Sequence, residues 1–237
     1  MHYLLIVALL AFLILIHELG HFVAAKWLKI PVARFSIGFG PKLWGWKWGE
    51  TEYWLSPIPL GGYVLPAVAD EREFFGIPWG KRLLFSLGGP AANLALPVVM
   101  LMGMNAAAGD VSLYGLFVAP VVQTGDVLVR LVTVLPQLFA QPDKLSGVVG
   151  IVAAGGEYVA MDLTRVLQFT IVLSINFAVF NLLPIPVLDG GKILLYLLER
   201  VYPKAVRLYV PLTILGLILV LGLILYVTAL DIGRIVT

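Results

Sequence analysis

The chain has 237 residues, of which 60% are hydrophobic and only 13% are charged, and its mean hydropathy is +0.98. Soluble domains carry about 25% charged residues, so a soluble fold would have too little interior for this apolar surface, and lipid must cover the rest. The small formal charge of +2 argues against a nucleic-acid-binding surface, and the absence of cysteine excludes disulfides and thiolate metal ligands.

Four segments are long and apolar enough to cross a hydrocarbon core, which needs about 20 residues: Leu4 to Leu28, Leu83 to Met104, Thr164 to Leu183 and Leu208 to Leu230. We therefore expect an α-helical polytopic membrane protein with about four core transmembrane helices, forming one domain over residues 1–237. The first span begins like a signal peptide, but no basic segment precedes it and no small-residue cleavage site follows it. We expect it to be retained.

The first span contains His17-Glu18-Leu19-Gly20-His21, an HExxH pattern. Histidines at i and i+4 share one helical face and can both reach one zinc ion, while Glu18 between them can activate a water molecule. Ionisable groups inside a bilayer cost at least about 2.5 to 3.5 kcal/mol each, so three of them within five residues indicate a function. The alternative is a pair of histidines hydrogen-bonded to a neighbouring helix, with Glu18 neutralised between them.

Charge assigns the connections between spans to the two sides of the membrane. Cytoplasmic loops carry an excess of Lys and Arg, and basic residues follow the first span, precede the second and follow the third: Lys26, Lys29, Arg34, Lys42, Lys47, Lys81, Arg82, Lys192, Arg200, Lys204 and Arg207. Residues 106–162 are mainly acidic where charged. We expect both termini and residues 106–162 to lie outside, with the HExxH pattern in the cytoplasmic half of the membrane.

Residues 32–65 are rich in glycine and proline and are predicted to form a small membrane-associated β-rich insert. Within it, Leu43 to Trp48 and Thr51 to Ile58 flank Gly49-Glu50, which favours a β-hairpin. Its tryptophans, Trp44, Trp46, Trp48 and Trp54, have two interpretations. They form an interfacial aromatic belt, or the sheet is partly sunk into the membrane and offers the edge at Thr51 to Leu55 to an extended peptide.

Residues 106–162 are expected to form an external linker. Leu116 to Phe139 is mostly apolar but is interrupted by Pro120, Asp126, Arg130 and Pro136. This pattern favours an amphipathic helix at the outer interface over a fifth span. The linker is too short for an additional globular domain.

A catalytic zinc ion needs three protein ligands and an open position, so a third ligand must come from elsewhere in the chain. His2 is expected on the outer side of the membrane, away from the HExxH pattern. Asp189 is the better candidate, because Pro184 and Pro186 stop the third span just before it and exposed backbone at membrane depth must line a polar cavity. The alternative role for Asp189 is a helix N-cap.

Three motifs together resemble the site-2 protease family of intramembrane metalloproteases: HELGH in the first span, Gly89-Pro90-Ala91-Ala92-Asn93 in the second, and the segment from Asn181 to Asp189-Gly190 after the third. Phe35 to Gly40 and Ile58 to Tyr63 resemble the bacterial branch that cleaves membrane-bound anti-sigma factors and remnant signal peptides. The resemblance extends over most of the chain.

The resemblance implies that His17, His21 and Asp189 bind Zn²⁺ and that Glu18 is the catalytic base. Asn176 and Asn181 match family asparagines that engage substrate. Asn93 has two possible roles, a hydrogen bond between helices or a function near the site. Members of this branch usually carry PDZ domains between the second and third core spans, and residues 106–162 leave no room for one.

The expected function is therefore regulated intramembrane proteolysis, with hydrolysis of peptide bonds in single-span membrane substrates at the cytoplasmic membrane of a bacterium. Lipid and substrate are the expected partners, and nucleic acid is not. A metal or proton transporter is an alternative, since intramembrane His, Glu and Asp also mark ion pathways, but four spans without repeats argue against it. A membrane-binding protein that has lost catalysis is disfavoured by the presence of all four chemical residues.

Overall fold

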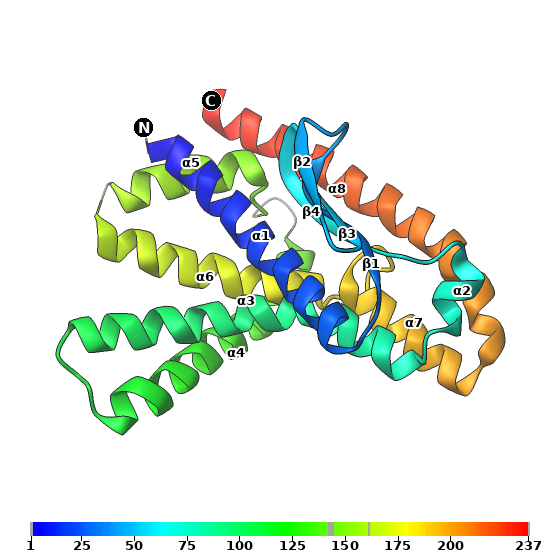
Figure 1. Ribbon diagram of the computed structural model, residues 1–237. Helices are drawn as coiled ribbons and strands as arrows, with labels where there is room; N and C mark the ends of the chain where they lie inside the picture. Colours follow the sequence, from blue (N-terminus) through cyan, green and yellow to red (C-terminus); the bar gives the residue numbers. More distant parts are fainter. Residues whose placement is uncertain (1, 142–144, 161, 237) are drawn as a thin grey trace. The chain divides into compact units, whose positions relative to one another are not determined.

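The computed structural model describes residues 2–141, 145–160 and 162–236, and long helices dominate it (Figure 1). Among the described residues, five helical segments are long and apolar enough to cross a membrane: His2–Trp27, Trp79–Ala107, Tyr114–Gln137, Leu163–Asn181 and Pro203–Arg234. Four of them coincide with the spans expected from the sequence. The polytopic helical fold is confirmed.

The elements follow one another as α1 (His2–Trp27), β1 (Val32–Phe39), β2 (Trp44–Trp48), β3 (Thr51–Leu55), β4 (Ile58–Pro66), α2 (Glu71–Gly76), α3 (Trp79–Ala107), η1 (Tyr114–Val118), α4 (Ala119–Ala140), α5 (Val148–Val159), α6 (Leu163–Asn181), α7 (Asp189–Val201), η3 (Pro203–Leu208) and α8 (Tyr209–Val236).

The fifth candidate span combines η1 with most of α4. The sequence favoured an interfacial helix over Leu116 to Phe139, but by length and hydropathy this helix also meets the requirement for a span. Its Leu128 and Leu131 pack against a buried cluster on α6 that contains Ile171 and Ile175. Composition and packing are therefore compatible with α4 either spanning the membrane or lying at its surface, and the number of crossings in the rest of the chain distinguishes the two.

The chain divides into two compact units. The first contains Met1–Leu9, Leu94–Phe180 and Gly216–Thr237, and the second contains Leu10–Asn93 and Asn181–Leu215. The second unit holds the sheet together with His17, Glu18, His21 and Asp189.

A buried carboxylate in the first unit joins two of its helices. Asp231 of α8 accepts hydrogen bonds from the backbone N–H groups of Gly147, at 2.9 Å, and Gly150, at 2.8 Å. These amides lie at the N-terminus of α5, where a negative charge is favourable. The carboxylate therefore fixes the start of α5 to α8.

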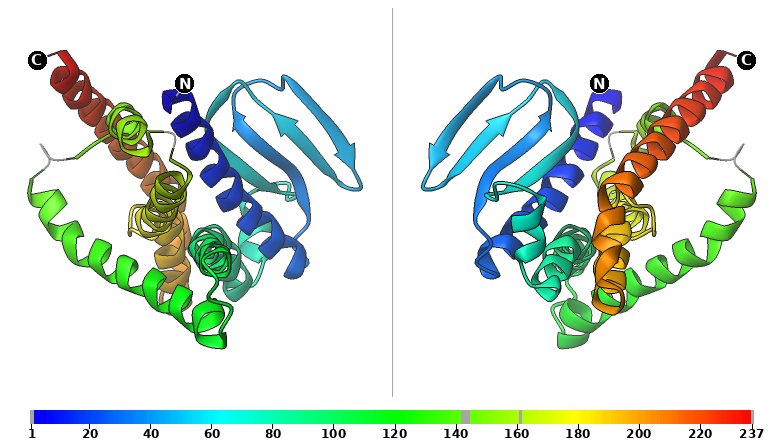
Figure 2. Two further views of the ribbon diagram at one scale, coloured as in Figure 1. Left: turned by 90° about the vertical axis from the view of Figure 1, so that its left-hand side faces the viewer. Right: turned by 90° about the vertical axis from the view of Figure 1, so that its right-hand side faces the viewer.

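The four strands form one sheet in the order β2-β3-β1-β4 (Figure 2). The predicted hairpin is present as β2 and β3, which pair in antiparallel fashion around Gly49, whose φ of +61° suits glycine. However, β3 also pairs in parallel with β1. The expectation that Thr51 to Leu55 offers a free edge is therefore wrong, since β3 is an inner strand and the outer strands are β2 and β4.

One face of the sheet carries a row of aromatic rings that begins at α1. Phe22 of α1 packs on Phe35 of β1, with ring centroids 5.3 Å apart, and Phe35 lies 6.1 Å from Tyr53 of β3. Tyr53 in turn stacks on Trp46 of β2 at 5.2 Å. The row attaches the sheet to α1 at its inner end, and the exposed Trp44 and Trp48 at its outer end are consistent with an interfacial belt.

Small residues allow α1 and α3 to approach each other closely. A Cβ atom added to Gly20 would lie 2.6 Å from the Cβ of Ala92, and one added to Gly88 would lie 2.6 Å from the carbonyl oxygen of Gly20. Gly20 and Ala24 on α1 therefore face Gly88 and Ala92 on α3, with the spacing of four that is typical of close helix pairs in membranes. This contact brings the HExxH face of α1 against α3.

Candidate metal centre

The candidate metal centre lies in the second unit, where α1 and the start of α7 meet. His17, His21 and Asp189 are all buried, and one ligand atom from each lies within 4.8 Å of the other two. Oδ2 of Asp189 is 3.0 Å from Nε2 of His17 and 3.1 Å from Nε2 of His21, and the two nitrogens are 3.2 Å apart. Residues 172 positions apart in the sequence thus direct three donor atoms at one point.

The hydrogen bonds of the other ring nitrogen of His21, Nδ1, indicate which kind of group can lie between the three donor atoms. Nδ1 of His21 lies 2.8 Å from the carbonyl oxygen of Phe85, which can only accept, and 3.3 Å from the backbone N–H of Gly89, which can only donate. The shorter contact favours the tautomer with the hydrogen on Nδ1. A neutral His21 then directs the lone pair of Nε2 toward the carboxylate of Asp189. Two lone pairs at this distance repel each other unless a proton or a metal cation lies between them, and two imidazoles with one carboxylate suit Zn²⁺.

Gly89 of α3 keeps space free beside the two imidazoles. A Cβ atom on this residue would lie 2.5 Å from Nε2 of His21 and 2.6 Å from Nε2 of His17. Zinc binds imidazole nitrogen at about 2.0 to 2.1 Å, so a side chain at position 89 would compete for nearly the same place. From the sequence, Gly89 stands out only as part of a family motif, because nothing in the neighbouring residues indicates that it lies beside the histidines.

Asp189 is the first residue of α7, and Leu188 occupies the N-cap position. The carboxylate of Asp189 binds the two histidines and Lys192, so the alternative that its sole role is to cap the helix is wrong. The two glycines that follow allow the preceding loop to fold over the helix start, because Cβ atoms on Gly190 and Gly191 would collide with the loop backbone.

Lys192 is a further residue of the centre that the sequence analysis did not single out. Its Nζ lies 3.1 Å from Oδ1 of Asp189, so the ammonium binds one carboxylate oxygen while the other faces the histidines. Burial alone would raise the pKa of Asp189, but Lys192 and the contacts with His17 and His21 outweigh it and hold that pKa below its usual value. A lowered pKa favours the ionised carboxylate, which is the form that metal binding requires.

Glu18 lies beside the sheet rather than among the three donors. A Cβ atom on Gly62 of β4 would be 2.7 Å from Cγ of Glu18, so glycine allows β4 to pass directly against this half-buried side chain. The position is suited to a base that works next to the metal without binding it.

The three asparagines occupy different surroundings. Asn93 of α3 is fully buried, and its amide nitrogen is 3.3 Å from Nδ1 of His17, so it forms a contact between helices at the centre itself. Asn176 belongs to the first unit, and its amide donates to the carbonyl of Val172 in the same helix at 2.9 Å. Asn181 is the last residue of α6 and is half-buried in the second unit.

Comparison with known proteins gives a match to the sequence model of peptidase family M50 over residues 5–225. A Clostridium perfringens protein named "Putative zinc metalloprotease" is 28% identical, with 96% of this chain and 98% of the relative aligned. A Clostridium acetobutylicum protein of the same description is 27% identical, with 85% and 88% aligned. A Treponema pallidum relative is 35% identical over 131 residues, which cover 48% of this chain and only 29% of the relative.

Proposed function

We propose that this chain, a zinc metalloprotease of the site-2 type that belongs to peptidase family M50, hydrolyses peptide bonds within the transmembrane segments of single-span membrane proteins. The observation that carries the proposal is the convergence of His17, His21 and Asp189 on one point, with Glu18 beside them and two of the ligands on a helix able to span the membrane. Membrane-bound anti-sigma factors or remnant signal peptides are the proposed class of substrate.

His17, His21 and Asp189 hold the metal in this proposal, and Glu18 is the general base. Zinc, when bound, supplies Lewis-acid chemistry that polarises the scissile carbonyl and acidifies water. Glu18 accepts the proton from the attacking water and returns it to the leaving amine. Phe85 and Lys192 orient His21 and Asp189 through the contacts described above.

The substrate must leave its helix before cleavage, because a transmembrane helix satisfies its amides with internal hydrogen bonds. We place the unwound segment on the free edge of β4, as an added strand. β4 is an outer strand of the sheet, and its Gly62 lies so close to Glu18 that a Cβ atom there would crowd that side chain. A peptide on this edge would therefore pass near the base. Asn176 and Asn181 are proposed to engage the substrate as well.

One ion pair supports the proposed membrane topology. Arg82, near the start of α3, donates to Glu199 of α7 at 2.8 Å, so these two segments share one side of the membrane. Because α7 follows α6 directly, α6 must cross in the opposite sense to α3. The segment between α3 and α6 must then cross the membrane an even number of times, or not at all. If α4 crossed, α5 would have to cross back, and α5 is only about 18 Å long, which is too short to span the hydrocarbon core.

We therefore propose four crossings, with α4 at the outer interface, both termini outside and the catalytic centre toward the cytoplasm of a bacterial cell.

Both compact units belong to one protease domain in this proposal, since the family match extends through each of them. The alignment with the Clostridium perfringens relative runs over 329 positions against 237 residues here, so that relative carries residues that this chain lacks.

The test uses the purified protein in liposomes, with metal analysis and a panel of single-span substrates. We expect about one zinc per chain, cleavage within the transmembrane segment, and loss of cleavage with a chelator. The variants His17→Ala, His21→Ala and Asp189→Ala should lose zinc and activity together. Stoichiometric zinc with unchanged affinity in Asp189→Ala would point to another third ligand. Transport of metal ions without any cleavage would favour the transporter instead.

A further inference from the structure

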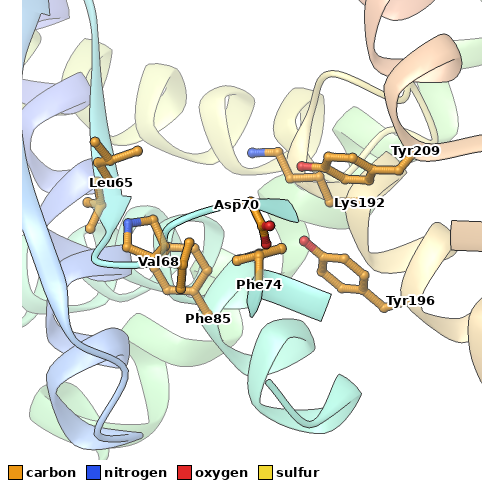
Figure 3. A pocket seen from close by; sticks show the side chains of 10 residues that line it. Leu65, Val68, Asp70, Phe74, Phe85, Lys192, Tyr196 and Tyr209 are labelled. Atoms are coloured by element: carbon orange, nitrogen blue, oxygen red, sulfur yellow. The ribbon is translucent and has the colours of Figure 1, made fainter. Parts of the chain in front are cut away.

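A cavity of about 310 Å³ lies at the C-terminal end of β4, entirely within the second unit (Figure 3). Leu65 of β4, Val68 of the following connection and Phe85 of α3 contribute to one side of it, as Figure 3 shows. Lys192, Tyr196 and Tyr209 lie on the other side. Most of the lining is apolar, which is the usual character of a ligand site.

Three connections join this cavity to the candidate catalytic residues. The ring of Phe85 packs on that of His21, with centroids 5.4 Å apart, and Lys192 binds Asp189 at 3.1 Å. The third connection is β4 itself, where Val64 lines the cavity two residues after Gly62, which lies close to Glu18. The cavity therefore adjoins the centre at the place where a bound peptide would continue past the base.

The geometry of a strand sets which part of a substrate reaches this cavity. Residues rise about 3.3 Å each along a strand, and alternate side chains point to the same face. A peptide on the free edge of β4 that passes Glu18 at Gly62 would reach Val64 and Leu65 within two or three residues. A side chain close to the scissile bond can thus enter the cavity.

The charged groups at the cavity already have partners. Lys192 is bound to Asp189, and the carboxylate of Asp70 accepts a hydrogen bond from the backbone N–H of Glu73 at 2.9 Å, as the N-cap of α2. A charged side chain entering the cavity would lose part of its hydration and would find both of these charged groups already engaged. The volume is at the lower end of the range for small-molecule sites, about 300 to 1,000 Å³, so it suits one or two side chains.

We propose that this cavity is a specificity subsite that receives one apolar substrate side chain, of leucine or phenylalanine size, located within three residues of the scissile bond. The inference rests on the proposed protease function and adds a sequence requirement to it. A substrate must then satisfy two conditions, a segment that unwinds easily and a large apolar residue at one fixed distance from the cut.

The experiment compares three enzymes on one set of substrates. Each of the three residues on either side of the cleavage site is replaced in turn by Ala, Leu, Phe or Asp, and kcat/KM is measured. Val68→Trp fills the cavity from a connecting segment, and Val201→Trp, at a position that is 85% exposed, is the matched control. Leu65→Ala enlarges the cavity as a second variant, and zinc content verifies that each protein is folded.

We expect the native enzyme to prefer Leu over Ala by about 10- to 100-fold at one position, since a few methylenes in an apolar pocket are worth this much. Val68→Trp should reverse the preference at that position alone, Leu65→Ala should shift it toward Phe, and Val201→Trp should change nothing. In zinc-loaded Glu18→Gln protein, a photoreactive phenylalanine analogue at the same substrate position should crosslink to residues that line the cavity.

Several results would overturn the subsite. Native specificity in both cavity variants would do so, as would a uniform loss of cleavage in zinc-loaded Val68→Trp for every substrate. Crosslinking to these residues only from photoreactive lipid would identify the cavity as a lipid site. These results leave the proposed function intact, whereas failure of the native enzyme to cleave any substrate would refute the function and the subsite together.

Discussion

A Cβ atom on Gly89 would lie 2.5 Å from Nε2 of His21, so α3 approaches the candidate metal position as closely as a glycine permits. The same construction at Gly103, on the same helix, meets no atom within 4 Å. The two glycines therefore form a matched pair for testing whether the space beside the histidines is needed for zinc.

Gly89→Ala is expected to lower zinc affinity at least 100-fold, because the added methyl group competes with the metal for space. Gly103→Ala should bind zinc normally and gain up to about 1 kcal/mol in helix stability. Zinc titration of both proteins gives the comparison. Equal affinities would show that the metal lies elsewhere or that α3 moves aside without cost.

Glu18→Gln should retain zinc while cleavage falls by about 10²- to 10⁴-fold or more, the usual contribution of a general base. The amide keeps the shape of the side chain but cannot accept the proton of the attacking water. Metal content and turnover are measured on the same preparation. Turnover close to that of the native enzyme would remove Glu18 from the mechanism.

Lys192→Met should weaken zinc binding by about 10- to 100-fold, the typical cost of losing an outer-shell partner of a ligand. Lys192→Arg keeps a cation beside Oδ1 of Asp189 and should recover most of this loss. A zinc affinity that is the same in the methionine and native proteins would show that the lysine does not orient the carboxylate. Melting temperatures of the native and variant proteins, measured with a chelator present so that no zinc is bound, show whether a substitution also destabilises the fold.

Strand addition on β4 predicts a pattern along that strand. Proline removes a backbone donor, so we expect proline at Gly61, Tyr63, Val64 or Leu65 to suppress cleavage with normal zinc content wherever the N–H points away from β1. Trp46→Pro and Lys47→Pro on β2, the other outer strand, should leave cleavage unchanged. Full activity throughout the β4 series, in folded protein, would reject this mode of binding.

Single cysteines test the topology, because the native chain has none. Ala108 and Glu157, before η1 and in α5, are both exposed, and cysteines at these positions should label together from outside an intact cell, whereas one at Lys47 should be protected. Labelling of positions 108 and 157 from opposite sides would show that α4 crosses. Asp143, which also belongs to the connection expected outside, lies beyond the described residues and is replaced here by Glu157.

Local patterns in the sequence were sufficient to predict the membrane-spanning helices, the shared face of the two histidines and the hairpin. Hydropathy predicted the four spans, the HExxH spacing predicted that His17 and His21 share a face, and the Gly49-Glu50 turn predicted the β2–β3 hairpin. Asp189 was predictable as the third ligand because the chain has no cysteine and because a proline-rich break in the third span precedes this residue. Its position beside the histidines agrees with that expectation, and its role as a zinc ligand stays a prediction.

Contacts between distant segments were not predictable in the same way. The parallel pairing of β3 with β1 depends on a partner outside the hairpin, so no local pattern indicates that Thr51 to Leu55 is an inner strand. Gly89 and Lys192 contribute through proximity to His21 and Asp189, and neither carries a spacing signal of its own. The hydropathy of α4 suits both an interfacial and a spanning helix, since it records composition and not orientation.

The separation of 172 residues between His17 and Asp189 has a consequence for biosynthesis. A ribosome must release most of the chain into the membrane before the third donor can join the two histidines, so a nascent or truncated protein carries HExxH without the complete candidate metal site. Binding to two imidazoles alone is weaker than to the full set, and metal uptake then becomes a late step that stabilises only the finished fold. If the proposed function holds, the protease thus stays inactive while its own helices are being inserted.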